Sequence, residues 1–209
     1  MRRAELVRIL ERVPSFPTPR AALEQVATPA EAAATLLERA QQWDGLSGRS
    51  VLDLGCGTGR LAIGAAALGA APVVGIDADA SVVAVARAAA SAAGVDVRFE
   101  VGPVERASGP AEVVVMNPPF GAQRRHADRP FWSAAFDRAE RSVYAFSLAA
   151  SRTFIARRAV ARDAQVLEVV PVRWLLGRTF PHHRRQGVSL DVDLWVLRTA
   201  GEKGGSRAP

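Results

Sequence analysis

The segment that most constrains the fold is an apolar run that ends in a glycine-rich turn. Residues 51–59 are Val-Leu-Asp-Leu-Gly-Cys-Gly-Thr-Gly, and a helical pattern begins at Leu61. A strand, a tight turn and a helix in this order let the backbone approach a nucleotide-like ligand at the carboxyl end of the strand. The spacing is G-x-G-x-G, and no Gly-Lys-Ser/Thr follows, which excludes a phosphate-binding P-loop.

Further strands and helices alternate along the chain. The patterns predict strands at 50–54, 72–76, 95–101, 111–116 and 165–170, and helices at 3–12, 28–42, 61–68, 80–92 and over most of 131–161. Thr28 is expected to cap the second helix, with Glu31 completing a capping box. Residues 188–197 alternate apolar and polar, as in a half-buried antiparallel strand. The chain is therefore predicted to be an α/β protein with a mostly parallel sheet and helices on both faces.

Length and composition are those of a single globular domain. Of 209 residues, 49% are hydrophobic and 23% are charged, enough for a full core without disulfides. Cys56 is the only cysteine, which excludes a disulfide framework and a cysteine-based zinc site within the chain. The charged N-terminus does not resemble a signal peptide, and no apolar run is long enough to span a membrane. We therefore expect a soluble, cytoplasmic protein.

Two carboxylates flank the glycine turn in the predicted fold. Asp53 lies two residues before Gly55, where it suits a ligand that carries an amino group and repels a pyrophosphate. S-adenosylmethionine (SAM) has that amino group and no phosphate. Asp77 ends the second strand, 22 positions after Gly55, where an acidic residue binds ribose hydroxyls in nucleotide-binding folds. A helix N-cap is the alternative for Asp77, but the combination favours a SAM site.

The most specific motif is Asn117-Pro118-Pro119-Phe120, directly after the fourth strand. The exocyclic amine of adenine or cytosine is a poor nucleophile because its lone pair is delocalised into the ring. The Asn amide oxygen and a Pro carbonyl can both accept hydrogen bonds from that amine, which turns its lone pair toward the SAM methyl group. Phe120 offers a flat face on which a base can stack. The motif thus indicates methyl transfer to an amine, with positioning as the main source of rate.

Arginines follow this motif and recur near the end of the chain. Arg124, Arg125 and Arg129 are placed to grip the phosphates beside a flipped nucleotide, and Arg184 and Arg185 to form an opposite wall. A solvated surface loop is the alternative for each run. The formal net charge of +6 fits a polyanionic partner, although arginine is also favoured by GC-rich codons. The three histidines, His126, His182 and His183, are not predicted to bind a metal, because no carboxylate cluster accompanies them.

Taken together, these segments resemble class I SAM-dependent N6-adenine methyltransferases. The motifs in order are Glu24-Gln25 with Thr28-Pro29, DLGCGTG at 53–59, GID at 75–77 and MNPPFG at 116–121. More narrowly, the chain resembles the small-subunit ribosomal RNA adenine-N6 methyltransferases, the methyltransferase-like-five branch of eukaryotes and its archaeal relatives, from about Leu6 to Arg198. This resemblance implies a Rossmann-like, mostly parallel seven-stranded sheet with an antiparallel strand near the C-terminus.

The resemblance also implies a set of site residues. Gln25 and Thr28 would close over the cofactor, residues 55–60 would hold its methionine part, Asp77 its ribose, and residues 117–120 the target adenine. The expected cofactor-binding residues are Gln25, Thr28, Asp53, Gly55, Gly57, Thr58, Gly59, Arg60, Asp77, Ala78, Val101 and Gly102. Two positions depart from the family. Val26 replaces a usual Tyr, and the third strand ends in Glu100-Val101-Gly102 rather than in an acidic residue beside the adenine of SAM.

Domain limits and partners follow from the same resemblance. Residues 1–28 would form an N-terminal helix and a cofactor lid, 29–199 the methyltransferase domain, and 200–209 a disordered tail. The expected partner is RNA, as ribosomal RNA or a ribosomal subunit. The family often works with a small zinc-binding activator subunit, which adds to an exposed edge strand to form a heterodimer.

Three alternatives remain at this level. A protein-glutamine N5-methyltransferase acting on release factors uses the same Asn-Pro-Pro turn on a primary amide. Phe120, where that class favours Tyr, and the arginine-rich loop argue against it. A non-catalytic SAM- or RNA-binding module would have no use for the intact motif at 117–120. A DNA adenine or cytosine amino-methyltransferase remains open.

Overall fold

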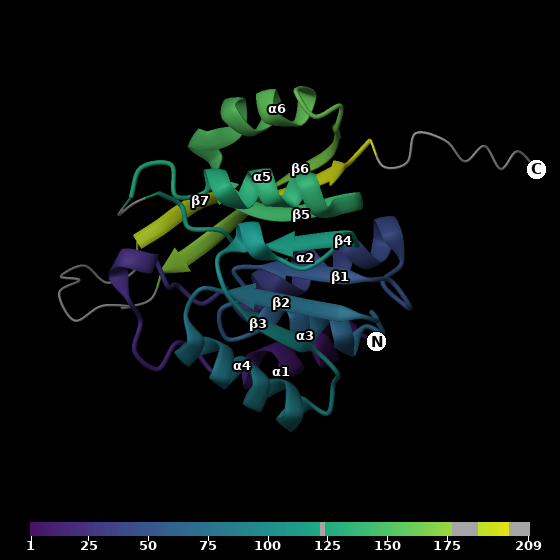
Figure 1. Cartoon of the computed structure of the whole chain (residues 1–209), viewed down its shortest axis with the longest axis vertical. Coiled ribbons are helices and arrows are strands. Elements are labelled where there is room, and N and C mark those ends of the chain that lie inside the picture. The colour runs from purple at the N-terminus through teal and green to yellow at the C-terminus, as the bar shows by residue number, and fades with distance from the viewer. Residues whose placement is uncertain (122–123, 177–187, 201–209) are drawn as a thin grey trace, which may run out of the picture.

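Seven strands form a single sheet in the computed structural model, which describes residues 1–121, 124–176 and 188–200. They lie across the sheet in the order β3-β2-β1-β4-β5-β7-β6 (Figure 1). The strands are β1 (Val51–Leu54), β2 (Val73–Asp77), β3 (Arg98–Val101), β4 (Ala111–Met116), β5 (Ala139–Leu148), β6 (Gln165–Leu176) and β7 (Val188–Arg198).

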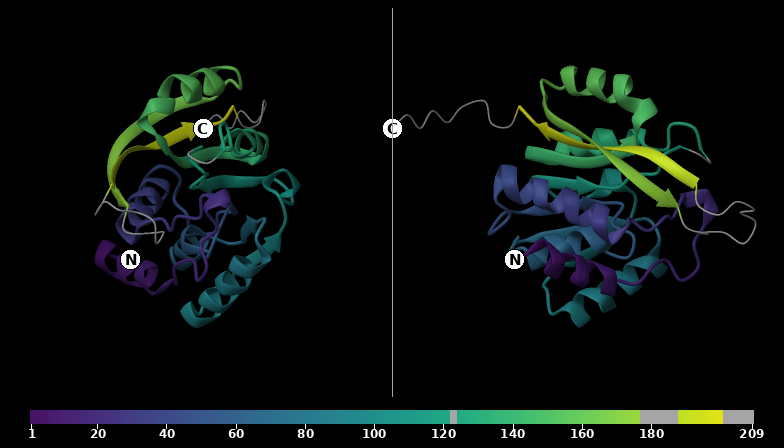
Figure 2. Two further views of the ribbon diagram at one scale, coloured as in Figure 1. Left: turned by 90° about the vertical axis from the view of Figure 1, so that its left-hand side faces the viewer. Right: turned by 180° about the vertical axis from the view of Figure 1, so that it is seen from behind.

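Strand direction confirms the predicted topology. Strands β1 to β5 run parallel to one another, whereas β7 pairs antiparallel with both β5 and β6. The order of the strands reverses between β1 and β4, and in open α/β sheets a ligand binds at the carboxyl ends of the strands at such a point. The long strands β6 and β7 extend past the others toward that edge (Figure 2).

Helices cover both faces of the sheet, as predicted (Figure 1). One face carries α1 (Arg3–Arg12), α2 (Ala30–Asp44), α3 (Arg60–Ala67) and α4 (Ala80–Ala93), and the other carries α5 (Arg129–Arg138) and α6 (Arg152–Val160). Short 3-10 helices lie at η1 (Ala21–Leu23), η2 (Val104–Arg106) and η3 (Ala149–Ser151). No helix in the described part is both long and apolar enough to cross a membrane.

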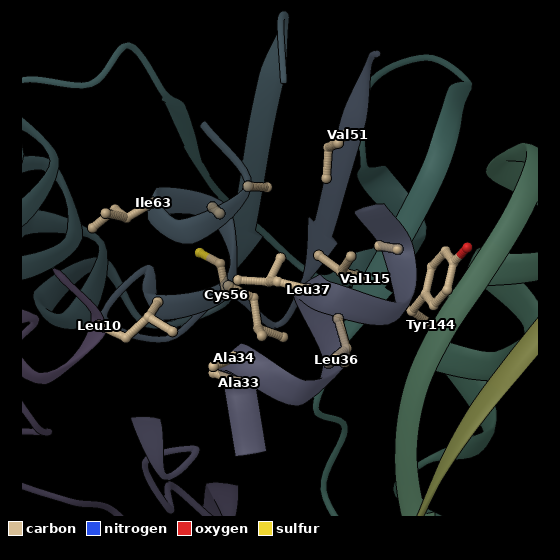
Figure 3. Packing of buried hydrophobic residues seen from close by; sticks show 14 of the residues in the cluster. Leu10, Ala33, Ala34, Leu36, Leu37, Val51, Cys56, Ile63, Val115 and Tyr144 are labelled. Carbon is tan, nitrogen blue, oxygen red and sulfur yellow. The ribbon is translucent and has the colours of Figure 1, made fainter. Parts of the chain in front are cut away.

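The core beneath α1, α2 and α3 is packed closely (Figure 3). Leu10, Leu37 and Ile63, one from each of these helices, are fully buried. Gly64 lets the three helices approach, because a Cβ at this position would lie 2.8 Å from Leu10 Cδ2 and would also overlap Leu37. The apolar residues of α1 therefore belong to the same core as the sheet, and α1 is not a separate appendage.

The prediction of helix over most of residues 131–161 is wrong in its middle. Residues 139–148 form β5, which is flanked by α5 and by η3 with α6. Positions 142–147 are buried without a break, because β5 lies inside the sheet with helices on both faces. A short apolar run of this kind has no periodicity that separates a buried strand from a buried helix.

The C-terminal part differs from the prediction in length. Strand β6 runs to Leu176, well beyond the expected end at 170, and passes through Pro171. A proline is tolerated there because β6 is the last strand in the sheet, so one N–H of the outer edge is not needed for pairing. The predicted antiparallel strand near the C-terminus is confirmed as β7. Most of the expected tail, residues 201–209, lies outside the described residues.

The predicted capping box at the start of α2 is also wrong. The helix begins at Ala30 with Pro29 as its N-cap, and no side chain caps it. Thr28 instead turns toward the cavity described below, and Glu31 pairs with Arg3 of α1.

A buried carboxylate ties α2 to the sheet at the end opposite the carboxyl ends of β1 and β4. Asp44 accepts hydrogen bonds from Tyr144 Oη at 2.6 Å, Arg198 Nη1 at 2.6 Å and Arg141 Nε at 2.9 Å. Burial alone would raise the pKa of Asp44, but these hydrogen bonds outweigh it and hold the pKa below its usual value. The ionised side chain therefore joins α2 to β5 and β7.

Asp44→Asn should lower the free energy of unfolding by about 2 kcal/mol at pH 7. This loss is smaller than that expected for a fully buried ion pair, because both arginines are partly exposed. Since folding lowers the pKa of Asp44, its contribution is fully present above a pH of about 4 and is lost as the pH falls through the folded pKa. Urea unfolding at pH 7 and at pH 3 measures both effects. Asp137→Asn, which breaks an exposed pair with Arg162, should change stability little. An equal loss for Asp44→Asn at both pH values would contradict this interpretation.

Candidate active site

A cavity of about 760 Å³ opens where the strand order reverses, at the carboxyl ends of β1 and β4. Segments far apart in the sequence form its walls. They are Phe16 with residues 21–28, the glycine turn at 55–58, residues 77–78, 103–105, 117–120 and 124–127, and Trp174 near the end of β6. Residues 13–28, several of which line this cavity, are called the lid segment below.

Asp53 reaches this cavity from the end of β1 with one free oxygen. Its Oδ2 accepts the backbone N–H of Ala62 at 3.0 Å, whereas its Oδ1 is shielded from solvent and accepts no hydrogen bond from the described residues. Burial raises the pKa of Asp53 to about 7. A buried carboxylate oxygen without a donor is costly unless a ligand supplies one.

Asp77 and Asp79 have separate roles at the end of β2. Asp77 accepts the N–H groups of Gly57 and Asp79, each at 2.9 Å, and burial raises its pKa. Asp79 is the N-cap of α4 and accepts the N–H of Ser81. The alternative of a helix cap at Asp77 is therefore wrong, and Asp77 lines the cavity beside Ala78.

Gln25 fastens the lid segment to the start of α4. Its Nε2 donates to Asp79 Oδ2 at 3.0 Å, and its Oε1 accepts the backbone N–H of Arg20 at 2.8 Å. Gln25 is buried and lines the cavity, in keeping with a lid residue.

Arg60 fastens both ends of the same segment. Its guanidinium donates to the carbonyl oxygen of Val13 at 2.6 Å and to that of Thr28. The resemblance gave Arg60 a contact with the methionine part of the cofactor. Arg60 does line the cavity, but its terminal nitrogens hold the lid.

The glycines of the turn allow aromatic rings to pack closely against the backbone. Gly55 and Gly57 have φ values of +70° and +53°, a region that disfavours other residues. A Cβ on Gly57 would lie 2.8 Å from the Phe16 ring of the lid, and one on Gly55 would lie 2.6 Å from the Phe131 ring of α5. The turn therefore forms the floor of the cavity, and aromatic side chains form part of its walls.

Asn117 is oriented by the lid. Its Nδ2 donates to Thr28 Oγ1 at 3.0 Å, while its Oδ1 is shielded from solvent and accepts no hydrogen bond from the described residues. Since the amide nitrogen is held by Thr28, the oxygen is left as an acceptor. The lid also contacts the residue after the motif, where Glu24 Oε2 accepts the N–H of Gly121 at 3.0 Å.

Phe120 is held by aromatic contacts that sequence reasoning missed. Trp174 lies edge-on to Phe120, with ring centroids 5.9 Å apart, and edge-on to Phe146, with centroids 5.2 Å apart. Trp174 is buried and lines the cavity. If the strand predicted at 165–170 had been extended to the observed end of β6, it would have placed Trp174 at this edge of the sheet. No local pattern in the sequence indicates that Trp174 contacts Phe120.

Some expected site residues lie elsewhere. Gly59, Val101 and Gly102 do not line the cavity, whose wall near β3 is formed by residues 103–105 instead. Arg124 and Arg125 line the cavity, whereas Arg129 does not and lies over the ring of Phe154. Arg184 and Arg185 fall outside the described residues. Among the described residues, no group of three or more His, Cys, Asp or Glu side chains could hold a metal ion.

The sheet order and this cavity define a class I SAM-dependent methyltransferase. The crystal structure of PH1948 from Pyrococcus horikoshii, a candidate RNA methyltransferase, is 33% identical, covers 95% of this chain and 98% of its own, and superposes with a TM-score of 0.88. The chain belongs to the Mettl5 family of rRNA N6-adenosine methyltransferases. It is 30% identical to Mettl5 of Drosophila melanogaster over 208 residues, 95% of this chain and 97% of the relative.

Two further comparisons match this chain, one over nearly its whole length and one over part of it. An uncharacterised protein of Methanocaldococcus jannaschii is 28% identical and is covered over 96% of both chains. The family model for ribosomal protein L11 methyltransferase (PrmA) matches residues 32–118. That shorter match spans the glycine turn and ends within the Asn-Pro-Pro motif, so it covers the cofactor-binding half of the domain.

The residues of the cavity fit SAM. The free Oδ1 of Asp53 is an acceptor of the kind that the cofactor's amino group requires, and Asp77 is placed for ribose hydroxyls at the end of β2. Apolar and aromatic walls around these carboxylates suit the adenine and the sulfonium-bearing chain. SAM, when bound, supplies an electrophilic methyl group.

Thr28→Val should lower the turnover number for methyl transfer about tenfold or more, because the amide of Asn117 loses its partner and can rotate. Thr28→Ser keeps the hydroxyl and should retain most of the activity. Steady-state kinetics give the turnover numbers, and calorimetry gives the SAM affinity, which should change far less. Equal activity of the Val and Ser variants would show that Thr28 only fills space.

The affinity for SAM should fall as the pH decreases below about 7. The pKa of Asp53 is raised to about 7, so below that pH the carboxyl is increasingly neutral and loses its attraction for the amino group of SAM. The dissociation constant should rise by up to about tenfold per pH unit between pH 7 and 5.5. Asp53→Asn should bind SAM more weakly at pH 7.5, with a flat profile. A wild-type profile as flat as that of the variant would contradict the assigned role.

Proposed function

We propose that this protein transfers a methyl group from SAM to N6 of an adenosine in ribosomal RNA, and specifically in the small subunit. The observation that carries the proposal is the buried Oδ1 of Asn117, an acceptor that no described residue uses, on the wall of a cavity with a SAM-like site. Membership of the Mettl5 family supports the choice of ribosomal RNA.

The chain's own groups activate the acceptor amine by orienting it. Asn117 Oδ1 accepts one N–H of the amine and the Pro118 carbonyl accepts the other. Because both hydrogens are then directed at acceptors, the nitrogen lone pair points out of the base plane, toward the methyl group. The fixed φ of the prolines keeps the carbonyl in place. Methyl transfer would form the new N–C bond as the S–CH3 bond of SAM breaks, with S-adenosylhomocysteine as the leaving group. The methylated nitrogen would then lose one proton to water, so no general base is needed beforehand.

The aromatic side chains hold the base during this step. Phe120 presents a ring for stacking, and its edge-on contact with Trp174 restricts its rotation. Stacking on an aromatic ring contributes about 1–3 kcal/mol for each base. A preformed ring lowers the cost of orienting the adenine, since less side-chain freedom is lost on binding.

An activator subunit and a cytoplasmic location complete the proposal. Strand β3 is the last strand at its side of the sheet and pairs only with β2 among the described residues, while Val101 at its end is about half exposed. A small zinc-binding subunit that adds a strand there would cover both the open backbone edge and this side chain. Co-expression followed by size-exclusion chromatography tests the heterodimer, and co-elution of the two chains is the expected result.

Wild-type protein should place labelled methyl groups on small ribosomal subunits, and digestion of the product should yield N6-methyladenosine. Asn117→Ala should reduce this labelling more than about a hundredfold, the effect of losing one positioned hydrogen-bonding group. Its SAM affinity and thermal stability should stay close to those of wild type, because Asn117 acts on the acceptor.

Parallel reactions with DNA and with a release factor serve as controls for the substrate. Labelling of glutamine in the release factor, with none in RNA, would replace the proposal by the protein-methyltransferase alternative. Full RNA methylation by Asn117→Ala would overturn the mechanism.

A further inference from the structure

Two arginines on the α5–α6 face share one aromatic ring. The guanidinium carbon of Arg129 lies 5.5 Å from the centre of the Phe154 ring, and that of Arg158 lies 5.8 Å from it. Arg129 begins α5, whereas Phe154 and Arg158 lie on α6. These three residues are called the arginine–phenylalanine stack below.

The stack keeps its positive charge. Two other arginines on this face are neutralised: Arg152 forms a bidentate pair with buried Asp193, and Arg162 pairs with Asp137. Neither arginine of the stack lies within 4.0 Å of a carboxylate among the described residues. A cation–π contact holds a guanidinium in place without cancelling its charge or using its N–H groups.

Structural needs do not account for this arrangement. Two like charges beside one ring repel each other. Arg129 also occupies the first turn of α5, where the helix dipole is positive and a further cation is unfavourable. An anion placed between or beside the two guanidinium groups would relieve both effects.

The stack continues directly from the active-site cavity. Arg124, Arg125 and His126 line the cavity, and His126 Nε2 lies 3.3 Å from a terminal nitrogen of Arg129. A path of cationic and polar groups therefore leads from the cavity through Arg129 to Arg158. Helices α5 and α6 lie together on that face of the sheet (Figure 1).

We propose that the arginine–phenylalanine stack is a second RNA contact, which binds the sugar-phosphate backbone beside the target nucleotide after it leaves the cavity. The proposal rests on the proposed RNA substrate. Guanidinium groups suit phosphate because their N–H donors match two of its oxygens. Phosphate contacts of this kind fix the position of the strand without reading its sequence.

The test uses RNA binding by variants of the stack. Arg158→Gln removes one charge, Phe154→Leu removes the ring and leaves both arginines, and Phe154→Tyr restores a ring. Arg162→Gln is the matched control, since this exposed arginine lies just beyond α6 and is already paired. Fluorescence anisotropy measures affinity for single-stranded RNA of about 16 nucleotides and of about four nucleotides around an adenosine. Thermal unfolding shows whether each variant is folded.

Arg158→Gln should weaken binding of the longer RNA severalfold and make the slope of log affinity against log salt shallower by about 0.7, the value for one phosphate contact on a single strand. Phe154→Leu should weaken it likewise, whereas Phe154→Tyr and Arg162→Gln should bind as wild type does. Binding of the short RNA should not change in any variant, because it fills only the cavity.

The outcomes separate this proposal from the proposed function. If wild type methylates ribosomal RNA and folded Arg158→Gln matches Arg162→Gln in affinity and salt slope, the stack is not an RNA contact while the function stands. If the stack variants lose affinity for RNA but wild type methylates only a protein, the contact stands and the function fails. If wild type neither binds RNA nor methylates ribosomal subunits, both are overturned.

Discussion

The hydrogen bond between Thr28 and Asn117 is the contact on which the orientation of the acceptor group depends. It joins a segment near the N-terminus to a turn 89 positions later, and it leaves one oxygen of Asn117 to face a substrate amine. Other contacts hold the lid in the position in which it makes this bond. Gln25 fixes it to α4, and Arg60 fixes its two ends to α3. These few polar contacts between distant segments thus fix the direction in which Asn117 Oδ1 points.

Much of the fold follows from local sequence. The alternation of strand and helix up to β4 is marked by short apolar runs that end at glycine or proline turns, and β7 is marked by its alternating pattern. The two errors, in the assignments of β5 and β6, have a different cause, because they depend on where each strand lies in the sheet. Strand β5 is central and covered on both faces, so its apolar run is indistinguishable from a buried helix. Strand β6 is at the edge, so Pro171 does not end it.

The site residues also divide into those that the local sequence predicts and those that it does not. Asp53, Asp77 and the turn at 117–120 could be predicted because each lies at the end of a strand, and the carboxyl ends of parallel strands converge. Phe16 and Trp174 could not be, since they come from the lid and the last strands and reach the cavity only through tertiary packing. Thr28 shows how local signals mislead. A Thr-Pro pair before a helix predicts a cap, but the hydroxyl forms its hydrogen bond with a residue of another element.

The double attachment of the lid segment has a thermodynamic consequence. On the cofactor side, the lid segment is attached by the hydrogen bond between Gln25 and Asp79. On the acceptor side, it is attached by the hydrogen bond between Thr28 and Asn117. A ligand that favours this placement of the lid on either side stabilises it on both. The two binding equilibria are then linked, and linkage is reciprocal: whatever factor SAM contributes to the affinity for the acceptor, the acceptor contributes to the affinity for SAM. The segment that orients one amide is thus also the physical connection between the cofactor side and the acceptor side of the cavity.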